Sequence, residues 1–389
     1  MKVVIDAVGV RGHGAAAVLE EVLRQIPMVR PDWDIEVFLL SRHLREFDDP
    51  APLPKRVHLK AQDFGDTALE RLMWSYIGFP SVCRRLRGNV ALCFANIGSR
   101  RPWTPQVVLV HQLLAINTAA HHTLRGLSRL RMRVLGRLIL GGARASRFVV
   151  VQSRWMKEAL ARLCPELQAK IFVIPSPIRE RVAQDGVIRE SLQRVAEVCS
   201  PLIVYVAHPA QHKDHATAVR ALSGIRDVFA DAALVLTLDP APRDKKSMVV
   251  VRALRRTIEG EGVADRVHLV GAIAGSEVDW LLERADLMVF PSLAESFGLP
   301  LAEAMACGCP IVAADVPYAH DVAEDCAVYF KASDSRDLAV KAISVLRDKA
   351  LATRMRIKGQ ERAKTLFGRS SVVRLVELLE MAAAVGKSI

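Results

Sequence analysis

The sequence has 389 residues, of which 51% are hydrophobic and 25% are charged, and its formal net charge is +12. This is the composition of a globular protein, and the length exceeds what one hydrophobic core usually holds, so we expect two domains. No apolar run approaches the roughly 18 residues that a membrane-spanning helix needs, which excludes a transmembrane class.

The chain begins with a strand-like apolar run that lacks the basic, apolar and small-residue order of a signal peptide, so we expect a cytosolic protein. Similar β-branched runs then alternate with helix-length segments, which is typical of βα units and a parallel sheet. In the first half the predicted strands are Val3 to Ala7, Ile35 to Leu40, Val57 to Lys60, Val90 to Phe94, Val107 to Val110, Phe148 to Val151 and Ile171 to Ile174.

A second series of strands follows a break at Pro175-Ser176-Pro177, where two prolines end strand pairing and cannot continue a helix. We therefore predict an α/β protein with domains at 1–176 and 177–369, and a last helix at 370–389 that packs back on the first domain. The predicted strands of the second domain are Leu202 to Ala207, Ala233 to Leu238, Val267 to Val270, Leu287 to Phe290, Ile311 to Ala314 and Val328 to Phe330.

The positive charge is confined to the first half of the chain. Residues 1–180 contain 27 Lys and Arg against 15 Asp and Glu, whereas residues 181–389 contain 27 of each kind. The stretch 71–157 has fifteen basic residues and no acidic ones. A surface of one sign attracts anions, so nucleic acid and an acidic membrane are both candidate partners.

The seven cysteines are scattered and lack the paired CxxC spacing of a zinc site, so we interpret them as buried, reduced thiols.

The segment 285–308, ADLMVFPSLAESFGLPLAEAMACG, is the strongest motif. It predicts a strand, a turn broken by proline, and a helix that begins near Gly298-Leu299-Pro300. The free N–H groups and the dipole of such a helix suit a phosphate, and carboxylates at Glu295 and Glu303 would accept hydrogen bonds from sugar hydroxyls. Without the surrounding residues, such a pair is more often an acidic residue near a helix start and a surface glutamate.

The letters around this glutamate pair resemble the EX7E region of glycosyltransferase family 4, which has the GT-B fold of two Rossmann-like domains facing a central cleft. The resemblance implies that Glu303 binds the ribose of a nucleotide-sugar donor. It places Glu295 by the donor sugar, with Ser296 and the backbone amides of Phe297, Gly298 and Leu299. It also implies transfer with retained anomeric configuration, without a cofactor and without a divalent metal ligated by an Asp-x-Asp pair. We expect no such pair in the sequence.

Two upstream loops extend the resemblance. VHLVGAI at 267–273 is similar to the family's nucleobase-binding loop, which makes Ile273 the candidate contact to the base. YVAHPAQHKD at 205–214 is similar to the loop that holds the donor phosphates, and Lys213 matches the family's lysine there. His208 stands near the position where the family has an arginine that holds the phosphates. His212 is a further candidate for contact with them. A cation is needed because negative charge builds on the leaving phosphate.

The resemblance implies that the first domain forms the acceptor side of the cleft. The glycine-rich loop after the first strand offers Arg11, Gly12 and Gly14 as lining residues. His111 ends a predicted strand at the carboxyl edge, where ligands gather in parallel sheets, and the resemblance makes it a catalytic candidate. Gln112 replaces an Asp that the family often has.

Within 71–157, arginines recur every four residues from Arg125 to Arg137, with leucines on another part of the same predicted helix. This pattern is typical of a basic amphipathic helix. It suits either a solvated basic surface or contact with an anionic membrane or a lipid-pyrophosphate acceptor.

We therefore expect a retaining glycosyltransferase that moves a hexose, of the mannose or rhamnose type, from a nucleotide-sugar to a lipid-linked or glycan acceptor in bacterial surface polysaccharide synthesis. The expected location is cytoplasmic, with peripheral contact to the inner membrane face. A GT-B nucleotide-sugar epimerase or phosphorylase is one alternative. A nucleic-acid-binding protein is a distant one, because no recognised nucleic-acid motif is present and few aromatic residues are interleaved with the arginines.

Overall fold

A computed structural model describes residues 1–10, 13–43, 53–65, 67–111, 126–179 and 188–385. The chain forms two compact units. The N-terminal unit consists of Met1–Arg179 and Phe367–Ile389, and the C-terminal unit of Glu180–Leu366. Each unit is built on its own parallel sheet, which confirms the predicted α/β class.

The N-terminal sheet has seven strands in the order β3-β2-β1-β4-β5-β6-β7, all paired in parallel. Every strand coincides with a predicted strand. The inner strands are apolar because both of their faces are covered, whereas the edge strand β3 is partly exposed and carries polar residues. Their bounds are β1 Lys2–Asp6, β2 Asp34–Leu40, β3 Val57–Gln62, β4 Val90–Cys93, β5 Gln106–Val110, β6 Phe148–Val151 and β7 Ile171–Val173.

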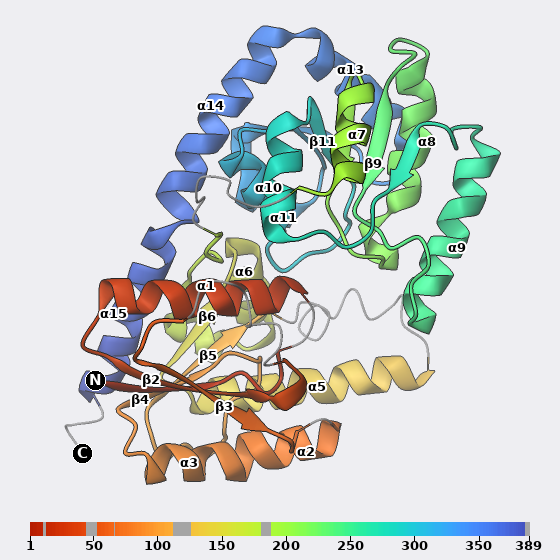
Figure 1. Ribbon diagram of the computed structural model, residues 1–389. Helices are drawn as coiled ribbons and strands as arrows, with labels where there is room; N and C mark the ends of the chain where they lie inside the picture. The colour runs from red at the N-terminus through yellow and green to blue at the C-terminus, as the bar shows by residue number, and fades with distance from the viewer. Residues whose placement is uncertain (11–12, 44–52, 66, 112–125, 180–187, 386–389) are drawn as a thin grey trace. The chain divides into compact units, whose positions relative to one another are not determined.

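Helices cover both faces of this sheet (Figure 1). On one face α1 packs against α15, and on the other η2, α3, α5 and α6 share a core with alternate strand residues such as Val108 and Val149. The helices are α1 His13–Val29, α2 Ala68–Met73, the π-helical turn η2 Trp74–Gly78, α3 Phe79–Arg85, α5 Gly126–Ala145, α6 Arg154–Leu163, the 3-10 helix η4 Pro165–Lys170 and α15 Arg369–Val385.

The C-terminal sheet has six parallel strands in the order β10-β9-β8-β11-β12-β13. Their positions also confirm the strands expected from the sequence. They are β8 Leu202–Tyr205, β9 Ala233–Leu236, β10 Val267–Leu269, β11 Leu287–Phe290, β12 Ile311–Ala314 and β13 Ala327–Phe330.

In this unit α8 packs on α9 and α13, whereas α11 packs on α10, α12 and α14. The helices are α7 Glu190–Val198, the 3-10 helix η5 Gln211–Lys213, α8 His215–Arg226, α9 Lys245–Gly260, α10 Gly275–Arg284, α11 Leu299–Ala306, α12 Pro317–Ala323, the 3-10 helix η6 Glu324–Cys326, α13 Ser335–Arg347 and α14 Lys349–Leu366. None of the helices within the described ranges has the length and apolar character to cross a membrane.

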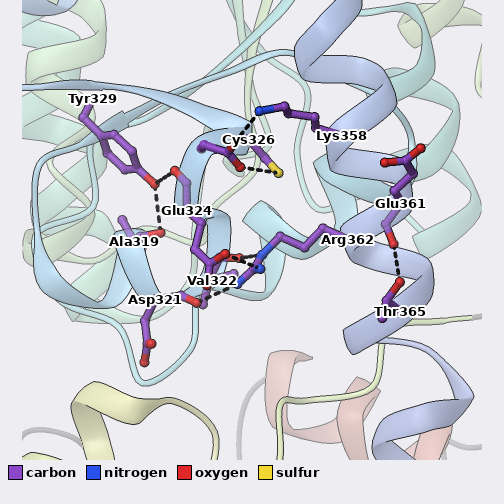
Figure 2. A network of polar contacts seen from close by, with 11 residues as sticks. Ala319, Asp321, Val322, Glu324, Cys326, Tyr329, Lys358, Glu361, Arg362 and Thr365 are labelled. Atoms are coloured by element: carbon purple, nitrogen blue, oxygen red, sulfur yellow. Dashed lines mark hydrogen bonds and ion pairs between the residues drawn. The ribbon is translucent and has the colours of Figure 1, made fainter.

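A polar network fixes α14 to the turn that follows α12 (Figure 2). Arg362 donates to the carbonyls of Val322 and Asp321, at 2.7 and 3.0 Å, and pairs with the Glu324 carboxylate at 2.7 Å. Glu324 has a φ of +43°, a strained conformation for a residue with a side chain. Because Arg362 binds the last carbonyls of α12 and the side chain of the strained residue, it stabilises this turn against α14.

Asp6 is a buried carboxylate at the carboxyl end of β1, an inner strand of the sheet. Its Oδ1 accepts hydrogen bonds from the Trp74 indole at 2.9 Å and from the Val8 amide at 3.2 Å. Burial dominates over these two hydrogen bonds and raises the pKa of Asp6 to about 6. The unfolded chain, with a pKa near 3.8, therefore binds fewer protons here than the folded protein between these values.

We predict that the stability of Asp6→Asn relative to wild type increases as the pH rises. The penalty of a buried Asp6 charge is absent below pH 3.8 and complete above about pH 6, where it amounts to at most about 3 kcal/mol. The melting temperature of Asp6→Asn minus that of wild type should thus be larger at pH 8 than at pH 4.5. The same difference at both pH values would show that folding does not raise the pKa of Asp6.

Candidate functional site

The candidate site lies at the carboxyl ends of β8 and β11. These strands are neighbours in the sheet, and the chain leaves them in opposite directions, to β9 and β10 on one side and to β12 and β13 on the other. In open parallel sheets, ligands bind in the crevice at such a switch point. Both loops that carry the strongest sequence motifs, 206–214 and 291–298, begin here.

Lys213 and Glu295 form a buried ion pair that joins the two loops. Their side chains are only 6% and 15% exposed. The Ser292 hydroxyl donates a second hydrogen bond to the same Glu295 oxygen, Oε1, at 2.7 Å. The two residues were each predicted to contact a donor, but the structure pairs them with each other, and the sequence did not show this pairing.

Further hydrogen bonds hold the same two loops together. The Leu293 amide donates to the His212 carbonyl at 2.7 Å, and the Tyr205 hydroxyl donates to the Lys213 carbonyl at 2.7 Å. The Tyr318 hydroxyl donates to the Ser292 carbonyl. Because the rings of Tyr205 and Tyr318 both pack on Phe290, the backbone next to the ion pair is supported by an aromatic core.

Asp214 connects the loop 206–214, which we expect to bind the donor phosphates, to the start of α8. It has a left-handed φ of +47°, which aspartate tolerates better than most residues. Its Oδ2 accepts hydrogen bonds from Thr217 at 2.7 Å and from Ser333 at 3.1 Å. This arrangement fixes the backbone directly after Lys213.

Helix α11 begins at Leu299, as the sequence predicts, and Gly298 precedes it with a φ of +86°. A side chain at Gly298 would be strained at this φ and would lie 3.3 Å from both Leu301 and Tyr318. Among the predicted donor ligands around it, Phe297 is buried, and Ser296, Leu299 and Glu303 are half-buried. Glu295 thus precedes the amino end of α11 in one short stretch of chain, and its ion pair brings Lys213 from the other loop to this stretch.

The predicted nucleobase loop follows β10, two strands away from β8. Gly271 has a φ of +80°, and Ile273 is half-buried just before α10. Glu277 lies below the loop and accepts hydrogen bonds from the Ala274 amide at 2.9 Å and from Arg189 Nε at 2.8 Å. Burial alone would raise the pKa of Glu277, but these hydrogen bonds and the Arg189 charge lower it below its usual value.

The histidines near Lys213 are not equivalent. His208 is exposed, and its carbonyl lies 3.2 Å from His215 Nε2. His212 is half-buried, and burial lowers its pKa despite the opposing charge of Glu295. The His212 imidazole is therefore neutral at pH 7, so that Lys213 is the charged partner next to Glu295.

The candidates of the first domain lie in the N-terminal unit. His111 directly follows β5, and its amide donates to Asn96 Oδ1 at 2.7 Å. Burial of the His111 ring lowers its pKa to about 4, so the imidazole is neutral at physiological pH. Gly14 is exposed in the first turn of α1, whereas Arg11 and Gly12, like Gln112, lie outside the described residues.

One cluster in the described part of the chain has the composition of a metal site. Asp34 and Glu36 of β2 lie near His58 of β3. Asp32 and Asp34 also form an Asp-x-Asp pair, so the expectation that the sequence contains no such pair is wrong. Lys2 lies 3.2 Å from Asp34, and Lys60 lies 3.7 Å from Glu36. The two lysines compensate these carboxylates, so we interpret the cluster as an ion-pair network.

Comparisons with known proteins match the part of the chain that contains this site. Residues 190–362 match the family described as "Glycosyl transferases group 1". The O-antigen chain mannosyltransferase RfbU of Salmonella typhimurium is 31% identical over 98 residues, which cover 25% of this chain and 28% of that protein. The matched segments span 11 to 46% of the lengths of the curated relatives.

Solved structures resemble the chain over nearly its whole length. Sucrose-phosphate synthase from Thermosynechococcus elongatus has a TM-score of 0.73 at 18% identity, with 99% of each chain covered. HepE from Anabaena, in complex with UDP-glucose, has a TM-score of 0.72 at 17% identity, with all of each chain covered. At this identity the likeness concerns the fold, and it confirms the predicted GT-B type.

We predict that Lys213→Met strongly destabilises the C-terminal unit, because it leaves the Glu295 carboxylate buried without its partner. Removing one member of a buried pair costs about 3 kcal/mol, which should lower the melting temperature by roughly 6–12 °C. The double variant Lys213→Met/Glu295→Gln should recover most of this loss, because neither charge remains.

Lys358→Met is the matched control, since Lys358 pairs with Asp325 at an exposed position of the same unit and should matter little. If Lys213→Met lowered the melting temperature no more than Lys358→Met, the ion pair at the switch point would not be the buried interaction described above.

Proposed function

Because residues 190–362 match the family of group 1 glycosyltransferases, we propose that this protein is a retaining, metal-independent hexosyltransferase that uses a nucleotide-sugar donor. The observation that carries the proposal is the Lys213–Glu295 pair at the switch point of the C-terminal sheet. A buried cation beside the amino end of a helix suits a diphosphate, and an adjacent carboxylate suits sugar hydroxyls.

Donor binding would exchange the partners within this pair. The donor diphosphate offers Lys213 a negative partner, which releases Glu295 to accept hydrogen bonds from the sugar. The amides at the amino end of α11 add positive potential next to the same phosphate. Glu303, within α11, would then bind the ribose hydroxyls, and Ile273 would contact the base.

The proposed reaction needs no covalent step on the protein. The acceptor hydroxyl oxygen forms a bond to the anomeric carbon as the bond from that carbon to the diphosphate oxygen breaks. The hydroxyl proton passes to the departing phosphate on the same face of the sugar, so the configuration is retained and a nucleoside diphosphate leaves. Lys213 and the α11 dipole would stabilise the charge that builds on the leaving oxygen.

The relatives support a proposal for the sugar and the acceptor. The likeness to an O-antigen chain mannosyltransferase favours a mannose-type hexose and a glycan or lipid-linked acceptor in surface polysaccharide or lipopolysaccharide synthesis. On the acceptor side we place His111, whose neutral imidazole can accept or donate a hydrogen bond, together with Arg11, Gly12 and Gly14.

We predict that one nucleoside diphosphate sugar among UDP-, GDP-, dTDP- and ADP-sugars stabilises the protein in a thermal-shift panel. A ligand at one hundred times its Kd adds about 2.7 kcal/mol of stability. Glu303→Ala should abolish most of the shift at the same ligand concentration without unfolding the protein, whereas Glu361→Ala, on the exposed side of α14, should preserve it.

Turnover then separates a transferase from an epimerase or a phosphorylase, since only a transferase releases nucleoside diphosphate in proportion to added acceptor. The proposed function would be wrong if none of the four donors shifted the melting temperature.

A contact with an anionic membrane is proposed for the N-terminal unit. Leu69, Met73 and Ile77 recur every four residues along α2 and η2 and are 68, 47 and 65% exposed. Exposed arginines follow at the end of α3, where Arg84 lies 4.7 Å above the exposed Trp103 ring. An apolar stripe next to arginines in an acid-free stretch suits a negatively charged lipid surface.

We predict that the protein sediments with vesicles that contain phosphatidylglycerol, and that 0.5 M salt weakens this binding. Leu69→Glu with Ile77→Glu should remove most of the bound fraction, because both changes put like charge and polarity on the apolar stripe. Val340→Glu, at an equally exposed apolar position of α13 in the other unit, is the control. Equal binding to neutral and anionic vesicles would contradict the membrane contact.

A further inference from the structure

Arg189 is an arginine that the sequence interpretation did not single out, and its side chain holds the whole loop after β10. Its Nη2 donates to the Ala272 carbonyl at 3.1 Å, and its Nη1 lies 3.5 Å from the Val270 carbonyl. Its Nε and its own amide both donate to Glu277 Oε1, at 2.8 and 3.2 Å. The planar guanidinium thus contacts the loop at two carbonyls and at the carboxylate beneath it.

Glu277 binds the same loop directly, in addition to pairing with Arg189. It is only 5% exposed, and its second oxygen, Oε2, accepts the Ala274 amide. The amides of Val270 and Gly271 donate to the Leu236 and Leu238 carbonyls, both at 3.0 Å. Each peptide group on either side of Ile273 is therefore tied to a fixed partner.

From this geometry we infer that Arg189 is a positioning residue that sets nucleobase specificity, by holding the Ile273 backbone as a rigid edge for the base. The inference rests on the proposed function, in which this loop receives the base of the donor. Base discrimination requires donors and acceptors in fixed places, because a loop that can rearrange forms equally good hydrogen bonds with several bases.

Lysine cannot replace arginine in this role. An ammonium group is a point charge that can pair with Glu277, but it cannot reach two carbonyls and a carboxylate at once with a planar fork of donors. The variant Arg189→Lys therefore separates charge compensation of Glu277, which it keeps, from the positioning of residues 270–274, which it loses.

The test is isothermal titration of the full-length protein with UDP, GDP and ADP, alongside melting temperatures. We expect wild type to prefer one nucleotide. Arg189→Met should weaken binding of the preferred nucleotide about tenfold while affecting the others less, so that the preference shrinks. Arg189→Lys should restore most of the melting temperature but not the preference. Arg194→Met, in an exposed ion pair with Glu190 on α7, should change neither quantity.

An equal loss of affinity for all three nucleotides, in parallel with a lower melting temperature, would show a merely structural role and overturn the inference. An unchanged preference in Arg189→Met would overturn it as well, and so would a wild type without preference. A wild type that binds one nucleotide selectively but transfers no sugar would contradict the proposed function, while a lost preference in Arg189→Met would still support the positioning role.

Discussion

The buried ion pair between Lys213 and Glu295 is the interaction on which the candidate site depends. Two opposite charges in a poorly hydrated place are stable only as long as they compensate each other. The protein places this pair between two loops that leave neighbouring strands in opposite directions. In the proposed function, the positive group binds the phosphate and the negative group binds the hydroxyls of the same ligand.

Several contacts within the C-terminal unit keep these two loops in place. Aromatic rings of β8, β11 and α12 support the loop backbones, and hydroxyl groups of Tyr205, Tyr318 and Ser292 satisfy polar atoms next to the pair. The left-handed residues Asp214 and Gly298 turn the chain into α8 and α11. The loop after β10 is also fixed by an ion pair, which Arg189 and Glu277 form.

Much of this architecture is predictable from the sequence, because strands buried on both faces are apolar runs whose limits are easy to see. All thirteen strands in the described ranges, and the start of α11, were expected. The pairing of Lys213 with Glu295 was not, since the two residues are 82 positions apart and a sequence does not state which strands lie side by side. Arg189 escaped notice for the same reason, as its partners lie more than 80 residues away. Arg11 and Gly12 stay predictions outside the described residues.

The most direct measurement of the central claim is a crystal structure of the protein with a nucleoside diphosphate sugar bound. The account predicts a donor phosphate oxygen within hydrogen-bond distance of Lys213 Nζ, with the Glu295 carboxylate turned from the lysine to the sugar hydroxyls. A bound donor that leaves the Lys213–Glu295 pair intact, with its diphosphate held elsewhere, would contradict the account.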